Sequence, residues 1–236
     1  MFEVRNIAFT YCGHPVLRDV SFVVSPGEAV SVVGANGAGK TTLLKILATL
    51  AVPDSGLVLT DGRNALANAG EYRRQLGYMP ENVAIYDDMT VKEYLIYRAR
   101  LKGEPPKRIR RRVGEAAEMC RLTDTLRRPI RWLSNGVRKR VALADALLLR
   151  PRVLLLDDFL AGLDSSMRES AGEVLSNAAA FSSVIVTGHE VDDLARWTTR
   201  FLILKDGVVS ATVDTAGAEP ADVRARVDAA LKGGAE

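Results

Sequence analysis

The sequence predicts an α/β fold built around a mostly parallel sheet, and three observations support this prediction. Apolar runs without polar alternation recur in the second half of the chain, as "RVLLLDD", "SSVIVT" and "RFLILK". Segments with helical spacing separate these runs, which is typical of strands that helices cover on both faces of a sheet. A glycine-rich turn also joins a further apolar run, "AVSVVG", to a segment with helical spacing, in the strand–turn–helix order of an α/β unit.

The composition is that of an ordinary globular protein. The chain has 236 residues, of which 47% are hydrophobic and 26% charged, and this is enough for one large domain with a substantial core. A net charge of +3 is too small to indicate nucleic acid, so no nucleic-acid partner is expected. Cys12 and Cys120 lie far apart without a CxxC pattern, which indicates free thiols in a reducing, cytosolic compartment. The N-terminus has no secretory pattern, and no apolar run approaches the ~20 residues of a bilayer span.

The first third of the chain reads as short strands with turns. "FEVRNIAF" and "VLRDVSFVV" are expected to be strands, and "SPGE" a turn before "AVSVVG". The helical spacing after Gly39 predicts a helix whose apolar face carries Leu43, Leu44, Leu47 and Leu50. Two Asp-Gly pairs predict hairpins, one turning at Asp61-Gly62 and one at Asp206-Gly207.

Strand signals stop between about Thr90 and Arg150. "TVKEYLIYRARLKG", "PKRIRRRVGEAAEMCRL" and "NGVRKRVALADALLLR" are all expected to be helices. The second helix carries a basic cluster, and we interpret it as a solvated helix face because no aromatic residues interleave and acidic residues follow. The cluster consists of Lys107, Arg108, Arg110, Arg111 and Arg112. From Thr215 onward the chain is rich in Ala, Gly and Asp and is expected to hold one short helix.

The segment "GANGAGKTT", Gly34 to Thr42, fits GxxxxGK[ST] and lies between a predicted strand and a predicted helix. Glycines in this pattern let the backbone wrap around phosphates, and the helix N-terminus adds positive potential there. Lys40 is expected to reach the β- and γ-phosphates, and the Thr41 hydroxyl to bind Mg²⁺. The nucleotide is therefore expected to contact Gly34, Asn36, Gly37, Ala38, Gly39, Lys40, Thr41 and Thr42.

Further stretches narrow the class of nucleoside triphosphatase. Tyr11 precedes the phosphate loop, "LGYMPE" ends at Glu81, "LSNGV" spans Leu133 to Val137, and "LLLDDFLAGLD" and "VTGHE" follow. In this order, the set resembles the nucleotide-binding subunit of ATP-binding cassette (ABC) transporters, over nearly the whole chain from Val4 to about Val213. A GTPase is excluded because the chain has no NKxD-like motif.

The resemblance implies an ABC ATPase fold. Such a fold has a P-loop core with a mostly parallel sheet, an antiparallel β-subdomain and a helical subdomain. We therefore expect one ATPase domain over residues 1–214, its helical subdomain at about 85–150, and a short C-terminal tail over 215–236.

The resemblance also implies roles for residues outside the phosphate loop. Tyr11 would stack on adenine, and Glu81, at the hinge between subdomains, would touch Mg²⁺ and face a membrane partner. The signature "LSNGV", with Ser134, Asn135 and Gly136, would cap the ATP that the opposite subunit holds. Taken alone, Ser134 reads as a helix N-cap, and it can serve as both.

Two acidic residues and a histidine complete the implied site. Asp157 matches the aspartate that organises Mg²⁺, and Asp158 stands where the family has its catalytic glutamate. His189 matches the histidine that senses the γ-phosphate, although without the resemblance a structural cap is an equally good interpretation. The dimer-contact loop would be formed by Gly162, Leu163 and Asp164.

The chain departs from the family pattern at four places. Glu81 replaces Gln, and "GYMPE" resembles the branch that serves ABC-2-type exporters of the multidrug, gliding and copper-maturation type. Asn135 replaces the first signature glycine, and its tolerance of left-handed backbone would preserve the loop. Val137 replaces the terminal Gln of the signature. Asp158 replaces the usual Glu, and Phe159 replaces the Pro that usually follows it.

The departure at Asp158 bears on the rate of hydrolysis. Asp is one methylene shorter than Glu, and a misplacement of ~1 Å can cost on the order of 10²-fold in rate. Phe159 lacks the fixed φ of proline, so the backbone could move forward and compensate. The simpler expectation is that the Asp158 carboxylate lies further back than a glutamate carboxylate would and that the backbone does not fully make up the difference. This predicts a slow ATPase.

The favoured function is an ATP-binding and ATP-hydrolysing subunit that energises a separate membrane-spanning permease, for export. It would lie peripherally on the cytoplasmic face of the membrane and pair as a homodimer or as a heterodimer with another cassette. One alternative is a soluble ABC protein of translation or DNA repair, although the chain has neither a second cassette nor a long coiled coil. Another is a regulatory cassette that binds ATP and hardly hydrolyses it.

Overall fold

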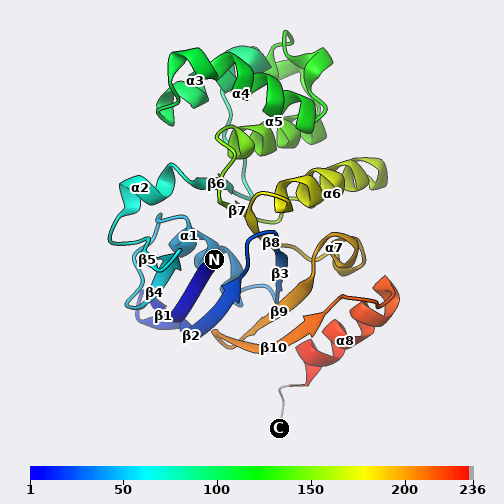
Figure 1. Cartoon of the computed structure of the whole chain (residues 1–236). Coiled ribbons are helices and arrows are strands. Elements are labelled where there is room, and N and C mark those ends of the chain that lie inside the picture. The colour runs from blue at the N-terminus through cyan, green and yellow to red at the C-terminus, as the bar shows by residue number, and fades with distance from the viewer. Residues whose placement is uncertain (234–236) are drawn as a thin grey trace.

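A ten-stranded sheet organises residues 1–233, the part of the chain that this computed structural model describes (Figure 1). From one edge to the other, the strands are β5 (Arg63–Asn64), β4 (Ser55–Thr60), β1 (Phe2–Tyr11), β2 (His14–Val24), β10 (Val208–Asp214), β9 (Arg200–Lys205), β3 (Ala29–Val33), β8 (Ser183–Thr187), β7 (Val153–Leu156) and β6 (Leu76–Met79).

The sheet has a parallel half and an antiparallel half. The strands β9, β3, β8, β7 and β6 are parallel neighbours. The strands β1, β2, β4 and β5 form an antiparallel group in which β1 lies between β2 and β4, and β10 pairs antiparallel with β9. The two halves join where β10 runs parallel to β2, at Val208 opposite Asp19. The predicted α/β fold with a mostly parallel core and an antiparallel β-subdomain is thus confirmed.

Successive residues of the central strands enter two different hydrophobic layers. In β7, Leu154 and Leu156 pack in the layer formed with α5 (Asn135–Leu147) and α6 (Ser165–Ala179). Val153 and Leu155 pack in the opposite layer, which includes the leucines of α1 (Lys40–Leu47). A strand buried on both faces has no polar side, which explains why these segments read as uninterrupted apolar runs.

The Asp-Gly hairpins form where the sequence predicts them. Asp61 and Gly62 have φ of +48° and +77°, and Asp206 and Gly207 have φ of +50° and +79°. Two consecutive residues with positive φ match the twist of the flanking strands, and Asp-Gly adopts this conformation at low cost.

The helix after the phosphate loop ends earlier than its leucine pattern suggests. Leu43, Leu44 and Leu47 are buried in α1, as predicted, but Leu50 lies beyond the helix and is 64% exposed. The helix ends at Leu47 because Thr49 adopts a left-handed conformation, with φ of +60°.

The remaining helices cover the sheet or form the predicted helical subdomain. α2 (Ala69–Arg73), α7 (Val191–Trp197) and α8 (Pro220–Lys232) complete the covering helices, and α8 buries Val223 and Val227. Figure 1 shows α3 (Val91–Leu101), α4 (Pro106–Met119) and α5 gathered at one end of the molecule, beyond β6. Within residues 1–233, no helix combines the length and the apolar character that crossing a bilayer requires.

A partly buried ion triad joins two helices of the helical subdomain. The Asp145 carboxylate on α5 lies 2.9 Å from the Arg98 guanidinium and 2.9 Å from the Lys102 ammonium, so it ties α5 to α3 and to the turn that follows α3. On α4, Lys107, Arg108, Arg110 and Arg111 are exposed, as expected for a solvated face. Arg112 departs from this expectation, since its side chain is only 17% exposed and pairs with Glu104 and Glu115.

Candidate functional site

The carboxyl ends of the parallel strands and the β1–β2 turn enclose a cleft of about 800 Å³. Because parallel strands end at the same edge of a sheet, residues distant in sequence meet there. The cleft is lined by Tyr11, Val16, Asn36, Gly37, Gly39, Lys40, Thr41, Thr42, Glu81, Asp157, Asp158, Thr187 and His189. Most residues that the sequence predicts around a nucleotide therefore share one cavity.

The phosphate loop requires glycine at particular positions. Gly39 precedes α1 with φ of +99°, and a Cβ there would lie 2.8 Å from Leu17 Cδ2. A Cβ at Gly34 would lie only 2.3 Å from the carbonyl oxygen of Leu204. Side chains at these positions would push the loop away from β2 and β9, so the glycines set the path of the loop.

Lys40 lies across the phosphate loop. Its Nζ donates to the carbonyl oxygens of Gly34, at 2.8 Å, and Ala35, at 3.1 Å. Partial burial lowers the pKa of Lys40, while the nearby carboxylates of Asp158 and Asp157 oppose this shift. The loop thus presents an ammonium group to the cleft and holds it by backbone contacts that a phosphate oxygen could replace.

Asp157 is buried, and its two carboxylate oxygens differ. Oδ1 accepts hydrogen bonds from the hydroxyls of Thr187, at 2.7 Å, and Thr41, at 3.3 Å. Oδ2 is buried without a hydrogen-bond partner among residues 1–233. Protein hydroxyls therefore fix one oxygen and leave the other available, on a residue that lines the cleft.

This donor set fits Mg²⁺ but does not form an all-protein cage. Thr41, Glu81 and Asp157 bring hard oxygen atoms to one cleft. Within the described part of the chain, no group of three or more His, Cys, Asp or Glu residues is arranged to hold a metal ion. Mg²⁺ is commonly held by one or two carboxylates together with substrate phosphates and water, which is the coordination that these residues would allow.

Asp158 adopts an unusual backbone conformation. Its φ is +47°, a left-handed value that Asp tolerates better than most residues. Its N–H donates to Thr187 Oγ1 at 2.9 Å, and its Oδ1 is buried without a hydrogen-bond partner in the described residues. A proline at 159 would favour extended backbone at 158, and Phe159 imposes no such restriction.

Burial and neighbouring charges act on the Asp158 carboxyl group. Burial raises the pKa of Asp158 most, and the nearby carboxylates of Glu190 and Glu81 raise it further. His189 and Lys139 oppose the shift. A carboxylate with a raised pKa and an unpartnered oxygen is suited to accept a proton from water.

The aromatic and imidazole groups lie at the rim of the cleft. Tyr11 is 66% exposed, so its ring is available to stack on the base of a nucleotide. His189 is also exposed, and its backbone N–H donates to Glu190 Oε2 at 3.3 Å. Gly34 and Ala38 line a neighbouring cleft on the outer side of the phosphate loop, which His189 also borders.

The signature residues lie apart from this cleft. Ser134 occupies the N-cap position of α5, but its side chain makes no cap hydrogen bond and is exposed. Asn135 begins the helix, so the left-handed tolerance expected of it is not used. Gly136 is the position that excludes a side chain, since a Cβ there would lie 2.1 Å from Met167 Sδ.

The predicted dimer-contact loop lies beside the signature. Gly162 has φ of +70°, and a Cβ built on it would lie 3.9 Å from Asn135 Nδ2. Asp164 caps α6, with its Oδ1 accepting the N–H of Met167 at 2.9 Å. The predicted site residues thus form two groups in one chain, one around the phosphate loop and one around the signature.

Sequence reasoning missed three residues of the site. Thr187 ends β8 beside β7, and this position at the edge of the sheet was the available signal. Lys139 and Glu190 reach the same region from α5 and from the start of α7, and their roles depend on contacts that the sequence pattern does not reveal.

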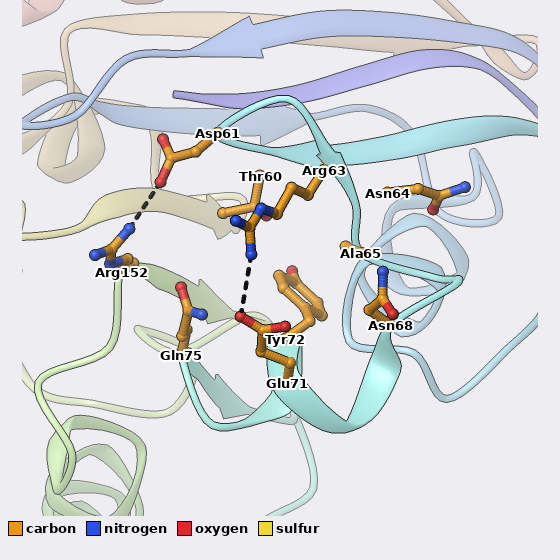
Figure 2. A pocket seen from close by; sticks show the side chains of 10 residues that line it. All are labelled: Thr60, Asp61, Arg63, Asn64, Ala65, Asn68, Glu71, Tyr72, Gln75 and Arg152. Atoms are coloured by element: carbon orange, nitrogen blue, oxygen red, sulfur yellow. Dashed lines mark hydrogen bonds and ion pairs between the residues drawn. The ribbon is translucent and has the colours of Figure 1, made fainter.

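A second pocket, of about 430 Å³, lies between the β4–β5 hairpin and α2 (Figure 2). It contains none of the predicted site residues. Figure 2 shows its charged groups pairing with one another, Arg152 with Asp61 at 2.8 Å and Arg63 with Glu71 at 3.6 Å. Because these charges neutralise one another, we assign no function to this pocket.

Comparison with known proteins matches the chain to one protein family and to named relatives. Residues 17–161 match the protein family described as "ABC transporter". The "Uncharacterized ABC transporter ATP-binding protein YxlF" of Bacillus subtilis (strain 168) is 32% identical over 210 residues, which cover 89% of this chain and 70% of that protein. The "Spermidine/putrescine import ATP-binding protein PotA" of Haemophilus influenzae is 30% identical over 213 residues, and this chain spans 57% of its length.

A solved structure supports the same assignment. The structure entitled "Dimeric Structure of MJ0796, a Bacterial ABC Transporter Cassette" superposes with a TM-score of 0.82 at 27% sequence identity. The superposition covers 92% of this chain and all of that one. Most of the fold is therefore shared with a known cassette.

Proposed function

This chain belongs to the ABC transporter family as an ATP-binding subunit that hydrolyses ATP, and from that premise we propose that it energises a separate membrane-spanning subunit. The observation that carries the proposal is the single cleft that holds Lys40, Thr41, Asp157 and Asp158, with one buried, unpartnered oxygen on each carboxylate. The ATPase domain would comprise residues 1–214, with the helical subdomain at about 85–150 and a C-terminal segment at 215–236.

The phosphate loop would bind the triphosphate. Lys40 would exchange its bonds to Gly34 and Ala35 for bonds to the β- and γ-phosphate oxygens, and the backbone N–H groups of the loop would surround the phosphates. Tyr11 would stack on the adenine. The Lys40 and backbone N–H contacts neutralise or shield phosphate charge, so the loop supplies binding and orientation.

Thr41, Asp157 and Glu81 are the residues that would hold Mg²⁺. The ion, when bound, neutralises charge on the phosphate oxygens. The Thr187 and Thr41 hydroxyls orient the Asp157 carboxylate, so its position does not depend on the ion. Glu81, being in the hinge segment, would also link this site to the helical subdomain and to the membrane partner.

Asp158 would act as the base that orients and polarises the attacking water, and His189 would contact the γ-phosphate. Burial and neighbouring carboxylates raise the pKa of Asp158, which favours acceptance of a proton. The side chain is one methylene shorter than glutamate, so we expect slow hydrolysis and a long-lived ATP-bound dimer.

Two copies of this chain, or this chain and another cassette, would sandwich ATP. The Ser134 hydroxyl is exposed and unused by its own helix, so it is free to bind a phosphate held by a partner. Asn135, Gly136 and Asp164 would contribute to the same interface. The dimeric cassette structure described above supports this arrangement.

The membrane partner would be a permease, and the protein would lie on the cytoplasmic face of the membrane. The proposal of export by an ABC-2-type system rests on Glu81 in "GYMPE". The named relatives include an importer subunit and an uncharacterised one, so they do not favour export. A soluble ABC protein and a regulatory cassette with little hydrolysis are the competing proposals.

Affinity capture tests the proposed partner. The tagged chain is expressed in its native host, the membranes are solubilised in detergent, and captured proteins, including any polytopic membrane protein, are identified by mass spectrometry. We expect the polytopic protein to be captured with the chain and to stimulate ATP hydrolysis in liposomes. A chain that stays in the supernatant without a polytopic partner would favour the soluble alternative.

A further inference from the structure

The loop that follows Asp158 is held by a lysine from the helical subdomain. Lys139 lies on α5, one turn after the signature residues. Its Nζ donates to the carbonyl oxygen of Ala161 and lies 3.5 Å from that of Asp158. A single ammonium group thus contacts two carbonyls of the segment that carries the candidate base.

The backbone of Asp158 depends on such contacts. A residue other than glycine in a left-handed conformation is uncommon and persists where its surroundings hold it. The N–H of Asp158 is held by Thr187 Oγ1, and its carbonyl oxygen accepts the N–H of Ala161 at 3.2 Å. Lys139 holds the same carbonyl from the other subdomain, so both polar groups of the Asp158 backbone are fixed.

The charge around Lys139 matches this role. The carboxylates of Asp158, Glu190 and Glu81 all lie near enough to favour its charged form, while partial burial lowers its pKa. Lys40, the other lysine in this region, is bound to the phosphate loop. Lys139 is therefore the cation that faces the three carboxylates from the helical subdomain.

The far end of the loop is fixed in a similar way. Arg168 on α6 donates from Nε to the carbonyl oxygen of Leu163 at 2.9 Å. The same guanidinium pairs with Glu190 at 3.4 Å and with Asp193 at 3.2 Å. The loop is thus tied to the start of α7, next to His189, while Lys139 ties it to α5.

We propose that Lys139 is a positioning residue for ATP hydrolysis, which fixes the Asp158 backbone through the carbonyls of Asp158 and Ala161 so that α5 and the candidate base move together. The proposal rests on the proposed role of Asp158 as the base. Movement of the helical subdomain would displace the Asp158 carboxylate along with α5, and hydrolysis would then depend on where that subdomain lies.

Substitution of Lys139 by Met tests the proposal, because Met keeps an unbranched stem and removes the ammonium group. Misplacement of a base by ~1 Å can cost on the order of 10²-fold, so we expect kcat to fall by at least about tenfold. The KM for ATP and the Kd for a non-hydrolysable ATP analogue should stay within about twofold of the parent, since the phosphate loop is untouched.

Lys139→Arg keeps a cationic donor and should restore part of kcat. Lys107→Met, an exposed lysine of the same subdomain, is the matched control and should behave like the parent.

A double-mutant cycle with Asp158→Asn separates this role from a structural one. If Lys139 acts through Asp158, Lys139→Met should have little further effect on single-turnover phosphate release in the Asp158→Asn background. An equal fall in both backgrounds, or a parallel loss of thermal stability and analogue affinity, would show a merely structural role and overturn the proposal.

Failure of the proposed role of Lys139 can be told apart from failure of the proposed role of Asp158. Parental kcat in Lys139→Met overturns only the role of Lys139. Parental kcat in Asp158→Asn overturns the proposed base and the role of Lys139 together.

Discussion

Thr187 Oγ1 donates a hydrogen bond of 2.7 Å to Asp157 Oδ1, joining the ends of two neighbouring parallel strands. The same hydroxyl accepts the N–H of Asp158 at 2.9 Å. One side chain thus orients both acidic residues of the candidate site, although they perform different proposed tasks. Hydrogen bonds from neighbouring protein groups determine how a carboxylate is oriented toward a metal ion or a substrate.

Thr187→Val removes this hydroxyl with little change of shape. The Asp158 N–H then loses its bond to Thr187, and Asp157 Oδ1 keeps only the Thr41 hydroxyl. An unsatisfied buried group costs roughly 1–3 kcal/mol. We expect the free energy of unfolding in urea to fall by that amount and the Mg²⁺ concentration for half-maximal hydrolysis to rise. Thr212→Val, on the exposed side of β10, is the control. An unchanged Mg²⁺ dependence would show that Thr187 supports the fold alone.

Lys40→Ala should abolish tight ATP binding. The substitution removes the cationic contact to the β- and γ-phosphates, and charge-assisted bonds of this kind are among the strongest in a site. Isothermal titration with Mg-ATP measures the loss. Lys45→Ala, an exposed lysine on the same helix, should bind like the parent. Unchanged affinity in Lys40→Ala would overturn the assignment of the phosphate loop.

Ser134→Arg should block nucleotide-dependent dimerisation, because the Ser134 hydroxyl is proposed to complete the partner's site. In an Asp158→Asn background that slows hydrolysis, Mg-ATP should convert monomer to dimer in light scattering. The bulky, charged side chain that Ser134→Arg introduces should abolish this shift, whereas Ser176→Arg on the exposed face of α6 should not. Normal dimerisation of Ser134→Arg would leave the serine as a helix-cap position only.

Asp158→Glu should raise the steady-state turnover of ATP, because the longer side chain carries its carboxylate further into the cleft. The left-handed backbone at this position suits Asp better than Glu, so a small fall in melting temperature should accompany the gain. A coupled phosphate-release assay measures kcat. If Asp158→Glu is slower than the parent, the pocket is built around the shorter acid.

Asp145→Asn should destabilise the helical subdomain. The substitution leaves Arg98 and Lys102 without a countercharge between α3 and α5. Breaking a fully buried pair costs about 3–5 kcal/mol, and we expect roughly 2 kcal/mol here because Arg98 is one-third exposed. Chemical denaturation measures the change, and the exposed pair Arg121–Glu173 offers a control in Glu173→Gln, which should have almost no effect.

The sequence predicted the elements whose signals are local. The Asp-Gly hairpins depend on backbone preferences of two residues, and the buried strands on burial that removes polar alternation. The short elements α2 and β6 have five and four residues, too few for a periodic pattern, and no prediction included them. The end of α1 was placed too late because Thr49, not the leucine pattern, determines it.

The candidate site was predictable where a motif fixes the residues, and not where tertiary contacts do. Lys40 and Thr41 follow from the spacing of the phosphate loop, whose geometry is local. The contact of Thr187 with Asp157 depends on the register of β7 against β8, in which Leu156 faces Val186. The contact of Lys139 with Ala161 depends on how α5 packs over a loop 22 residues later, and no periodicity in the sequence encodes that distance.

The alternation of β7 side chains between two hydrophobic layers extends to Asp157, the residue that follows the strand. Odd-numbered residues of this strand face α1, and Asp157 continues that series to reach Thr41 on α1. Even-numbered residues of β7 face α5, but Asp158 lies beyond the strand, and its left-handed backbone ends the alternation. The pleat of β7 therefore accounts for the direction of the Asp157 side chain, whereas the left-handed backbone at Asp158 accompanies a second carboxylate that lines the same cleft. Inserting or deleting one residue within 153–156 would therefore turn the Asp157 side chain away from Thr41 while leaving the Asp-Asp pair in place.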